Sequence, residues 1–129
     1  MAIDTSAWPA LEAQIQIAEG NRNEVWRGFL RVVPVSIRQS RRDEQSLEWE
    51  LDLIEFLSAQ GFRVPTVVRS ADGRRHVNGV VVQRWLDGHP PSSTRDWRLV
   101  ADTLQRIHRI TSTYPQRPGC CAVAEFDSD

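Results

Sequence analysis

The sequence predicts an α+β fold in which a five-stranded antiparallel sheet carries one inserted helix. Short segments with alternating apolar and polar side chains indicate the strands. Residues 43–60 instead repeat apolar side chains at the spacing of a helix. The Asp72-Gly73 pair is a strong signal for a hairpin turn between two later strands. No glycine-rich turn opens the helix, so a dinucleotide-binding strand–helix–strand unit is not predicted.

Each predicted strand is bounded by residues typical of turns. Residues 1–11 are predicted as an irregular or helical lead-in, because Pro9 limits any helix there. The polar run 19–23 separates the first two strands, and Pro34 weakens the third near its start. Val64-Pro65 gives an extended exit from the helix toward the fourth strand. The predicted strands are residues 12–18, 24–30, 32–39, 66–70 and 77–85.

Two helices are predicted, and residues suited to capping flank both. Asp43 can cap the N-terminus of the first helix, residues 43–60, and Gly61 suits its C-terminal cap. The second helix covers roughly residues 95–111, after a break rich in glycine and proline. Three hydroxyl residues can cap this second helix: Ser92, Ser93 and Thr94.

Glu50 lies where a carboxylate is unexpected. It is one turn from Leu47 and one turn from Ile54, within the apolar surface of helix 43–60. A buried carboxylate is costly unless a cation or hydrogen-bond donors meet it, and Arg38 at the end of the third strand is the nearest upstream cation. We therefore expect these two groups to pair, with a purely structural ion pair or a glutamate at the solvent rim as alternatives. The other acidic residues of the helix share a separate face: Glu44, Glu48, Asp52 and Glu55.

Composition narrows the classes of function. The 129 residues carry a net charge of −1, which gives no general attraction to nucleic acid or an anionic membrane. All 16 basic residues are arginine, so lysine-based chemistry is excluded. No segment has the length and apolarity of a membrane span, and the N-terminus lacks a signal sequence, so a cytoplasmic location is expected. Cys120 and Cys121 are interpreted as ordinary thiols.

Several other candidate groups are interpreted as structural or solvated. His108 lies on the apolar stripe of the second helix without a partner at metal or triad spacing, so we expect a structural role. His76 and His89 lie in turns and are expected at the surface. The arginine pairs at residues 41–42 and 74–75 are expected to face solvent.

The order of these motifs resembles the N-terminal lobe of the aminoglycoside phosphotransferase-like kinases. This broad family phosphorylates small molecules with ATP and shares the protein-kinase fold. The resemblance covers roughly residues 12–112 and only the first lobe of such an enzyme. It is carried by a nucleotide-loop-like segment at residues 20–26, a strand at 35–38, a Gly-then-Val-Pro passage at 61–65 and a hinge-like segment at 80–88.

The resemblance implies a phosphate-binding set of residues. Gly20, Asn21 and Asn23 would belong to the loop whose backbone amides cradle the phosphates. Arg38 occupies the position of the family's usual phosphate-binding lysine and would hold phosphate oxygens by forked hydrogen bonds. Glu50 matches the helix glutamate that fixes this cation. The plain alternatives are a polar hairpin turn and a strand-end arginine in solvent.

The resemblance also implies an adenine site at the hinge. Adenine would lie against apolar side chains and bond to main-chain groups of about Arg84 and Leu86. The signal depends on backbone atoms, so a buried strand that ends in an Asp-Gly turn is the plain alternative.

The family's catalytic residues have no counterpart in these 129 residues. Its second lobe carries a His-x-Asp loop and a later metal-binding aspartate, and no histidine here is followed by aspartate two residues on. Asp127 and Asp129 lie in a terminal tail without the context for that role. We expect residues 1–88 to form the nucleotide-binding lobe and residues 89–129 to begin an incomplete second lobe. The chain is therefore expected to be the front of a longer kinase, or a truncated product that does not catalyse transfer alone.

The predicted function is that of an ATP-dependent phosphotransferase acting on a small hydroxylated acceptor, with Mg²⁺ required only in a complete two-lobe enzyme. The alternative is a non-catalytic kinase-like lobe that acts as a protein interaction module. Its exposed underside, with Trp85, Trp97 and Phe126 as candidate lining, would also permit self-association. No nucleic-acid or membrane partner is expected, because the charge is balanced.

Overall fold

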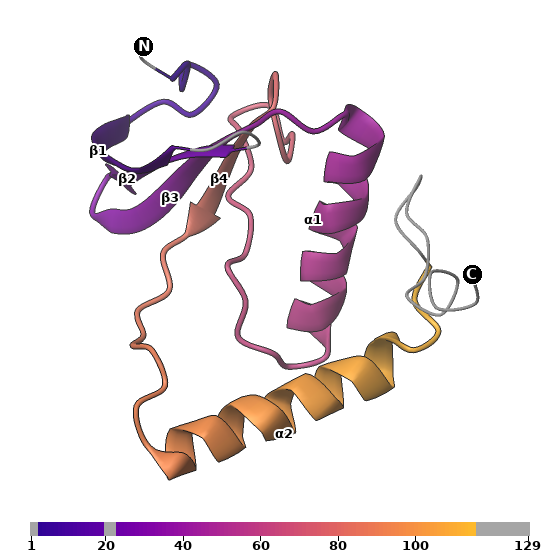
Figure 1. Cartoon of the computed structure of the whole chain (residues 1–129). Coiled ribbons are helices and arrows are strands. Elements are labelled where there is room, and N and C mark those ends of the chain that lie inside the picture. Colours follow the sequence, from indigo (N-terminus) through magenta and orange to yellow (C-terminus); the bar gives the residue numbers. More distant parts are fainter. Residues whose placement is uncertain (1–2, 20–22, 116–129) are drawn as a thin grey trace. The chain divides into compact units, whose positions relative to one another are not determined.

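The computed structural model describes residues 3–19 and 23–115. The chain divides into two compact units, the first ending at Leu86 and the second beginning at Asp87 (Figure 1). The second unit contains α2 (Thr94–Thr111). The described part of the first unit contains β1 (Leu11–Glu19), β2 (Asn23–Leu30), β3 (Val33–Ser40), α1 (Glu44–Ala59) and β4 (Val80–Arg84).

The strands form one antiparallel sheet in the order β1-β2-β3-β4. Residues 66–68 add a short fifth strand at the β4 edge: the Val68 N–H donates to the Val82 carbonyl at 2.8 Å, and the Arg84 N–H donates to the Thr66 carbonyl at 2.9 Å. This strand is shorter than predicted because the chain turns at Ser70, whose N–H donates to the Arg74 carbonyl. The predicted α+β fold, an antiparallel sheet with one inserted helix, is confirmed.

The turn before β4 corrects one predicted boundary. The fifth predicted strand began at Val77, but β4 begins at Val80, after a tight turn formed by Asn78 and Gly79. Both turn residues have positive φ, 51° and 82°, which is the conformation that Asn-Gly pairs favour in two-residue hairpins. A Cβ atom on Gly79 would lie 2.6 Å from the Ser40 carbonyl oxygen, so glycine is also required sterically.

The core lies on both faces of the sheet. One face buries residues from β2, β3 and β4 together with Trp8, whose indole N–H donates to the Val68 carbonyl at 2.9 Å. The lead-in before β1 therefore contributes a core anchor that the sequence did not indicate. On the other face, Leu47 and Leu51 of α1 pack against Val81 of β4. The helix is thereby packed against β4.

Both ends of α1 follow the predicted capping. The Asp43 carboxylate accepts a hydrogen bond from the Ser46 N–H at 3.1 Å, which satisfies one of the free amides of the first turn. After the helix, Gly61 has a φ of 92°, and the Phe62 N–H returns to the Leu57 carbonyl at 3.1 Å. This closure is the common glycine-terminated helix end.

The second unit contains a helix at the predicted position, with the Ser93 hydroxyl accepting a hydrogen bond from the Asp96 N–H at 3.1 Å. Apolar side chains of α2 remain exposed, including Trp97 and Leu104, and no side chain of the helix is buried. His108 is exposed as well, so the expected place in a packed stripe is not realised in the described residues. Neither described helix has the length and apolarity needed to cross a membrane.

Candidate functional site

Arg38 is placed beside α1 by the alternation of β3. Val35 and Ile37 of this strand are fully buried on one face of the sheet. Arg38 therefore points to the opposite face, and in the register of the sheet it pairs with Val81, which packs against α1. The alternation of side chains along β3 thus places the Arg38 guanidinium on the face of the sheet that α1 covers, and not on the face that buries Val35 and Ile37.

Glu50 of α1 meets this guanidinium. Arg38 Nη1 donates to Glu50 Oε1 at 2.8 Å, and the two side chains are only 13% and 23% exposed. The ion pair expected from the sequence is therefore present. Because solvent reaches both groups poorly, water screens their attraction less than it screens an exposed surface ion pair.

Three buried atoms of this pair have no hydrogen-bond partner among the described residues. They are Nε and Nη2 of Arg38 and Oε2 of Glu50. Buried donors and acceptors are normally satisfied, so atoms left over at an ion pair indicate a place for a further polar group. The two donors of Arg38 suit an anionic oxygen, because a guanidinium presents N–H groups in a planar fork.

The expected phosphate loop is only partly described. Gly20 and Asn21 lie outside the described residues. Asn23 begins β2, and its backbone pairs with Ser40 at the end of β3. Asn23 therefore lies at the same end of the sheet as Ser40, which is two residues beyond Arg38 in β3.

The expected hinge residues lie at the end of the first unit. Arg84 ends β4 and is exposed, and its N–H donates to the Thr66 carbonyl at 2.9 Å. Leu86 is the last residue of the first unit and is 37% exposed. Between them, the Arg27 guanidinium lies 4.8 Å from the centroid of the Trp85 ring, a cation–π contact that connects β2 to the residue after β4.

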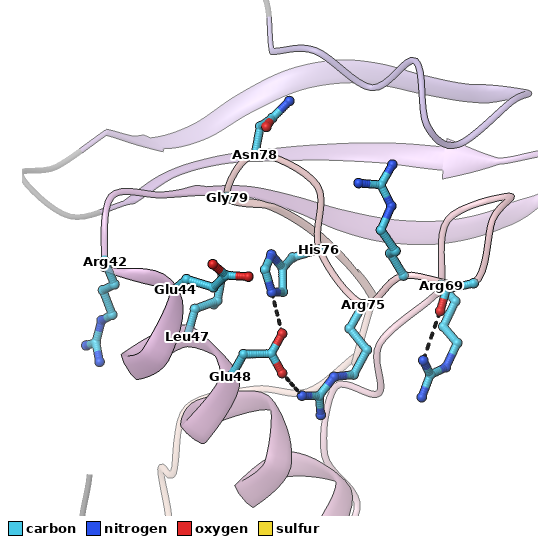
Figure 2. A pocket seen from close by; sticks show the side chains of 11 residues that line it. Arg42, Glu44, Leu47, Glu48, Arg69, Arg75, His76, Asn78 and Gly79 are labelled. Atoms are coloured by element: carbon cyan, nitrogen blue, oxygen red, sulfur yellow. Dashed lines mark hydrogen bonds and ion pairs between the residues drawn. The ribbon is translucent and has the colours of Figure 1, made fainter. Parts of the chain in front are cut away.

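A second polar cluster lies on the acidic face of α1 (Figure 2). Arg75 is only 13% exposed; it contacts Glu48, and its Nη1 lies 2.8 Å from an Asp52 carboxylate oxygen and 3.4 Å from one of Glu55. His76 Nε2 lies 2.5 Å from Glu48 Oε1. The cluster borders an open pocket of about 490 Å³.

These contacts shift the pKa values of the cluster. Burial alone would raise the pKa of Glu48, but hydrogen bonds from His76 and Arg75 outweigh it and leave the pKa below its ordinary value. Burial would likewise lower the pKa of Arg75, but hydrogen bonds to Asp52 and Glu48 outweigh it and raise the pKa. Both groups are therefore held in their charged forms.

The cluster corrects two expectations. Arg75 and His76 were expected in solvent, and both are largely buried against α1. Arg74, the other member of that arginine pair, is 58% exposed, and His89 is exposed, as expected. The spacing of acidic residues along the helix was the available signal, because carboxylates one helical turn apart repel one another and a nearby cation relieves that repulsion.

Comparison with known protein families gives a match over most of the chain. A protein-family model described as "Phosphotransferase enzyme family" matches residues 14–119. No curated protein matches the chain. The matched range contains β2, β3, α1, β4 and α2 completely, together with most of β1.

Proposed function

Because this chain belongs to the phosphotransferase enzyme family, we propose that it is the nucleotide-binding lobe of an ATP-dependent small-molecule kinase. Membership confirms the resemblance noted in the sequence and supports a phosphotransferase-like function in general. The nucleotide, the acceptor class and the residues that bind them are our proposal.

The observation that carries the proposal is the pair formed by Arg38 and Glu50. Glu50 occupies one nitrogen of the guanidinium, and Nε and Nη2 stay buried without a described acceptor. A phosphate group offers acceptor oxygens at the spacing of this fork. We propose that Arg38 holds phosphate oxygens of ATP while Glu50 fixes the guanidinium from the helix side.

The remaining nucleotide contacts would come from backbone. The chain at Gly20, Asn21 and Asn23 would approach the phosphates with main-chain amides. At the hinge, adenine would bond to Arg84 and Leu86. Since the Arg84 N–H already donates to the Thr66 carbonyl, Arg84 would contribute its carbonyl oxygen.

In the proposed reaction, the acceptor hydroxyl oxygen bonds to the γ-phosphorus of ATP, and the bond from that phosphorus to the β–γ bridging oxygen breaks. The hydroxyl proton passes to a base, and the products are ADP and a phosphorylated acceptor. Positioning and charge stabilisation provide most of the catalysis in such transfers. These 129 residues contain no His-x-Asp motif, so we propose that a second lobe supplies the base and the ligands for Mg²⁺.

Calorimetric titration with ATP tests the proposal on the 129-residue chain. We expect saturable binding that Arg38→Ala weakens at least about tenfold, or about 1.4 kcal/mol, while Arg38→Lys keeps part of it. Arg63→Ala is the matched control, because Arg63 is exposed and outside the proposed site. Equal ATP affinity in the Arg38→Ala variant would remove Arg38 from the site. Complete absence of ATP binding would favour the non-catalytic interaction module.

A further inference from the structure

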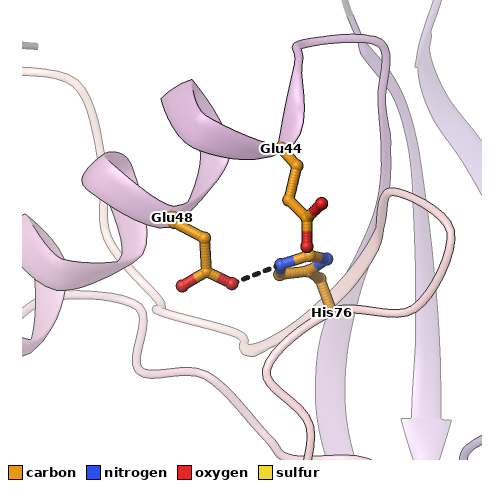
Figure 3. A group of neighbouring side chains, drawn as sticks. All are labelled: Glu44, Glu48 and His76. Atoms are coloured by element: carbon orange, nitrogen blue, oxygen red, sulfur yellow. Dashed lines mark hydrogen bonds and ion pairs between the residues drawn. The ribbon is translucent and has the colours of Figure 1, made fainter. Parts of the chain in front are cut away.

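Three potential metal ligands converge at the start of α1, away from Arg38. Glu44 and Glu48 are one helical turn apart, so their carboxylates lie on the same face of the helix. His76, from the loop before β4, points at them from the opposite side (Figure 3). One ligand atom from each residue lies within 4.8 Å of the other two. We propose that these three side chains bind a divalent transition-metal ion of the Zn²⁺ class.

The chemistry of the ligand set fits this class of ion. An imidazole nitrogen with carboxylate oxygens is a ligand set that Zn²⁺ accepts, commonly with water in the remaining position. Tetrahedral bonds of about 2.0–2.1 Å place neighbouring ligand atoms roughly 3.4 Å apart. The present separations are close to that value: Glu48 Oε1 and His76 Nε2 are 2.5 Å apart, and one ligand atom of each residue lies within 4.8 Å of the other two. Small side-chain rotations therefore convert the hydrogen-bonded arrangement into a coordinating one.

The acidic face of α1 carries more carboxylates than arginine side chains that contact it. The acidic face of α1 carries four carboxylates, and two guanidiniums meet it: Arg75 contacts three of the four, and Arg69 contacts only Glu55, at 3.6 Å. In the described part of the chain, Glu44 forms no ion pair. Like charges one helical turn apart are destabilising, so a cation between Glu44 and Glu48 would stabilise the first turns of the helix.

Arg75 acts as a positioning residue for the site. It contacts Glu48 Oε2, and this directs Glu48 Oε1 toward His76. Metal-binding carboxylates are commonly fixed by such outer hydrogen bonds, which decide which oxygen faces the ion. The pocket of about 490 Å³ beside the cluster gives an ion and its water access from solvent.

The test is a calorimetric titration of Zn²⁺ into the metal-free 129-residue chain. We use the Cys120→Ser/Cys121→Ser background, because thiols bind Zn²⁺ strongly. We expect one equivalent to bind, with affinity reduced at least about tenfold by His76→Ala and by Glu44→Gln. His108→Ala is the matched control, an exposed histidine outside the cluster, and should leave the affinity unchanged.

Co²⁺ absorption gives a second readout, because the spectrum reports the coordination geometry of the bound ion. The expected spectrum shows a tetrahedral or five-coordinate ion that is lost in the Glu44→Gln variant, in which an exposed carboxylate is replaced without loss of size. Zn²⁺ binding that survives both His76→Ala and Glu44→Gln would overturn the proposal. So would the absence of saturable binding in the cysteine-free background. ATP binding is measured separately, so failure here leaves the nucleotide proposal standing.

Discussion

Arg38 Nη1 and Glu50 Oε1 join β3 to α1 through one hydrogen bond of 2.8 Å, although each group could form more. An arginine and a carboxylate that served only to bind one another would favour a two-point contact. Here the second carboxylate oxygen and two guanidinium nitrogens are buried and without described partners. The one-point contact leaves these buried donors available to a further acceptor. This is the observation behind our proposal that the pair binds a ligand.

Glu50→Ala is expected to lower the free energy of unfolding by about 1.5–3 kcal/mol, the range for a hydrogen bond to a charged group. The loss arises because the Arg38 guanidinium stays buried after its only described acceptor is removed. Urea denaturation followed by circular dichroism measures the change.

The matched variant for that experiment replaces both partners with apolar residues, Arg38→Met with Glu50→Leu. Buried ion pairs exchanged for well-packed apolar side chains often lose little stability. We therefore expect the double variant to be more stable than Glu50→Ala alone. A double variant that is less stable than Glu50→Ala would show that the pair itself holds the helix.

Gly79→Ala is expected to destabilise the fold more than Gly73→Ala. Both glycines have positive φ, 82° and 84°, so alanine costs about 1–2 kcal/mol in backbone strain at either position. Only at Gly79 does the new Cβ meet backbone, the Ser40 carbonyl oxygen at 2.6 Å, whereas nothing lies within 4 Å at Gly73. Thermal unfolding of the two variants side by side measures the difference, and equal melting temperatures would contradict the steric argument.

Trp8→Phe is expected to cost about 1–3 kcal/mol, because the Val68 carbonyl loses the indole N–H that lies 2.9 Å away. The Trp8 side chain is only 3% exposed, so the ring volume is also needed by the core. Trp97→Phe serves as the control. Trp97 is 58% exposed, and its replacement should change the free energy of unfolding by less than about 0.5 kcal/mol.

The Arg38–Glu50 pair could be predicted because it depends on two neighbouring segments of the sequence. A carboxylate within an apolar helix face requires a cation, and the alternation of the preceding strand offers one candidate. The cap Asp43 could be predicted for the same reason, since a cap acts within three residues, and Ser93 was among the three candidates for the second helix. Such features depend on short stretches of sequence.

The remaining features depend on contacts across the fold. Trp8 reaches Val68, 60 residues away, and nothing near Trp8 in the sequence reveals that partner. Arg75 and His76 are buried only because the loop that carries them lies against the acidic face of α1. Local polarity indicated solvent for both residues, and tertiary packing overrode that preference.

In the turn between Ser70 and Arg74, one carboxylate is expected to make the free energy of unfolding depend on pH. The Ser70 hydroxyl hydrogen-bonds to Asp72, and this contact, more than the neighbouring Arg74, lowers the pKa of Asp72 from its ordinary value of 3.8. Because the folded-state pKa lies below the unfolded one, the carboxylate contributes stability at neutral pH. That contribution begins to fall as the pH approaches the unfolded pKa and is lost once the pH drops below the folded one.

Ser70→Ala should therefore raise the Asp72 pKa toward its ordinary value, and NMR titration of the Asp72 side-chain carboxyl carbon measures it. Arg74→Ala should raise the same pKa less, because Arg74 and Asp72 are 58% and 57% exposed and water screens their attraction. Ser70 is only 6% exposed, so its hydroxyl is held in place beside the carboxylate. If Arg74→Ala produced the larger rise, charge attraction rather than the serine hydrogen bond would control the carboxylate.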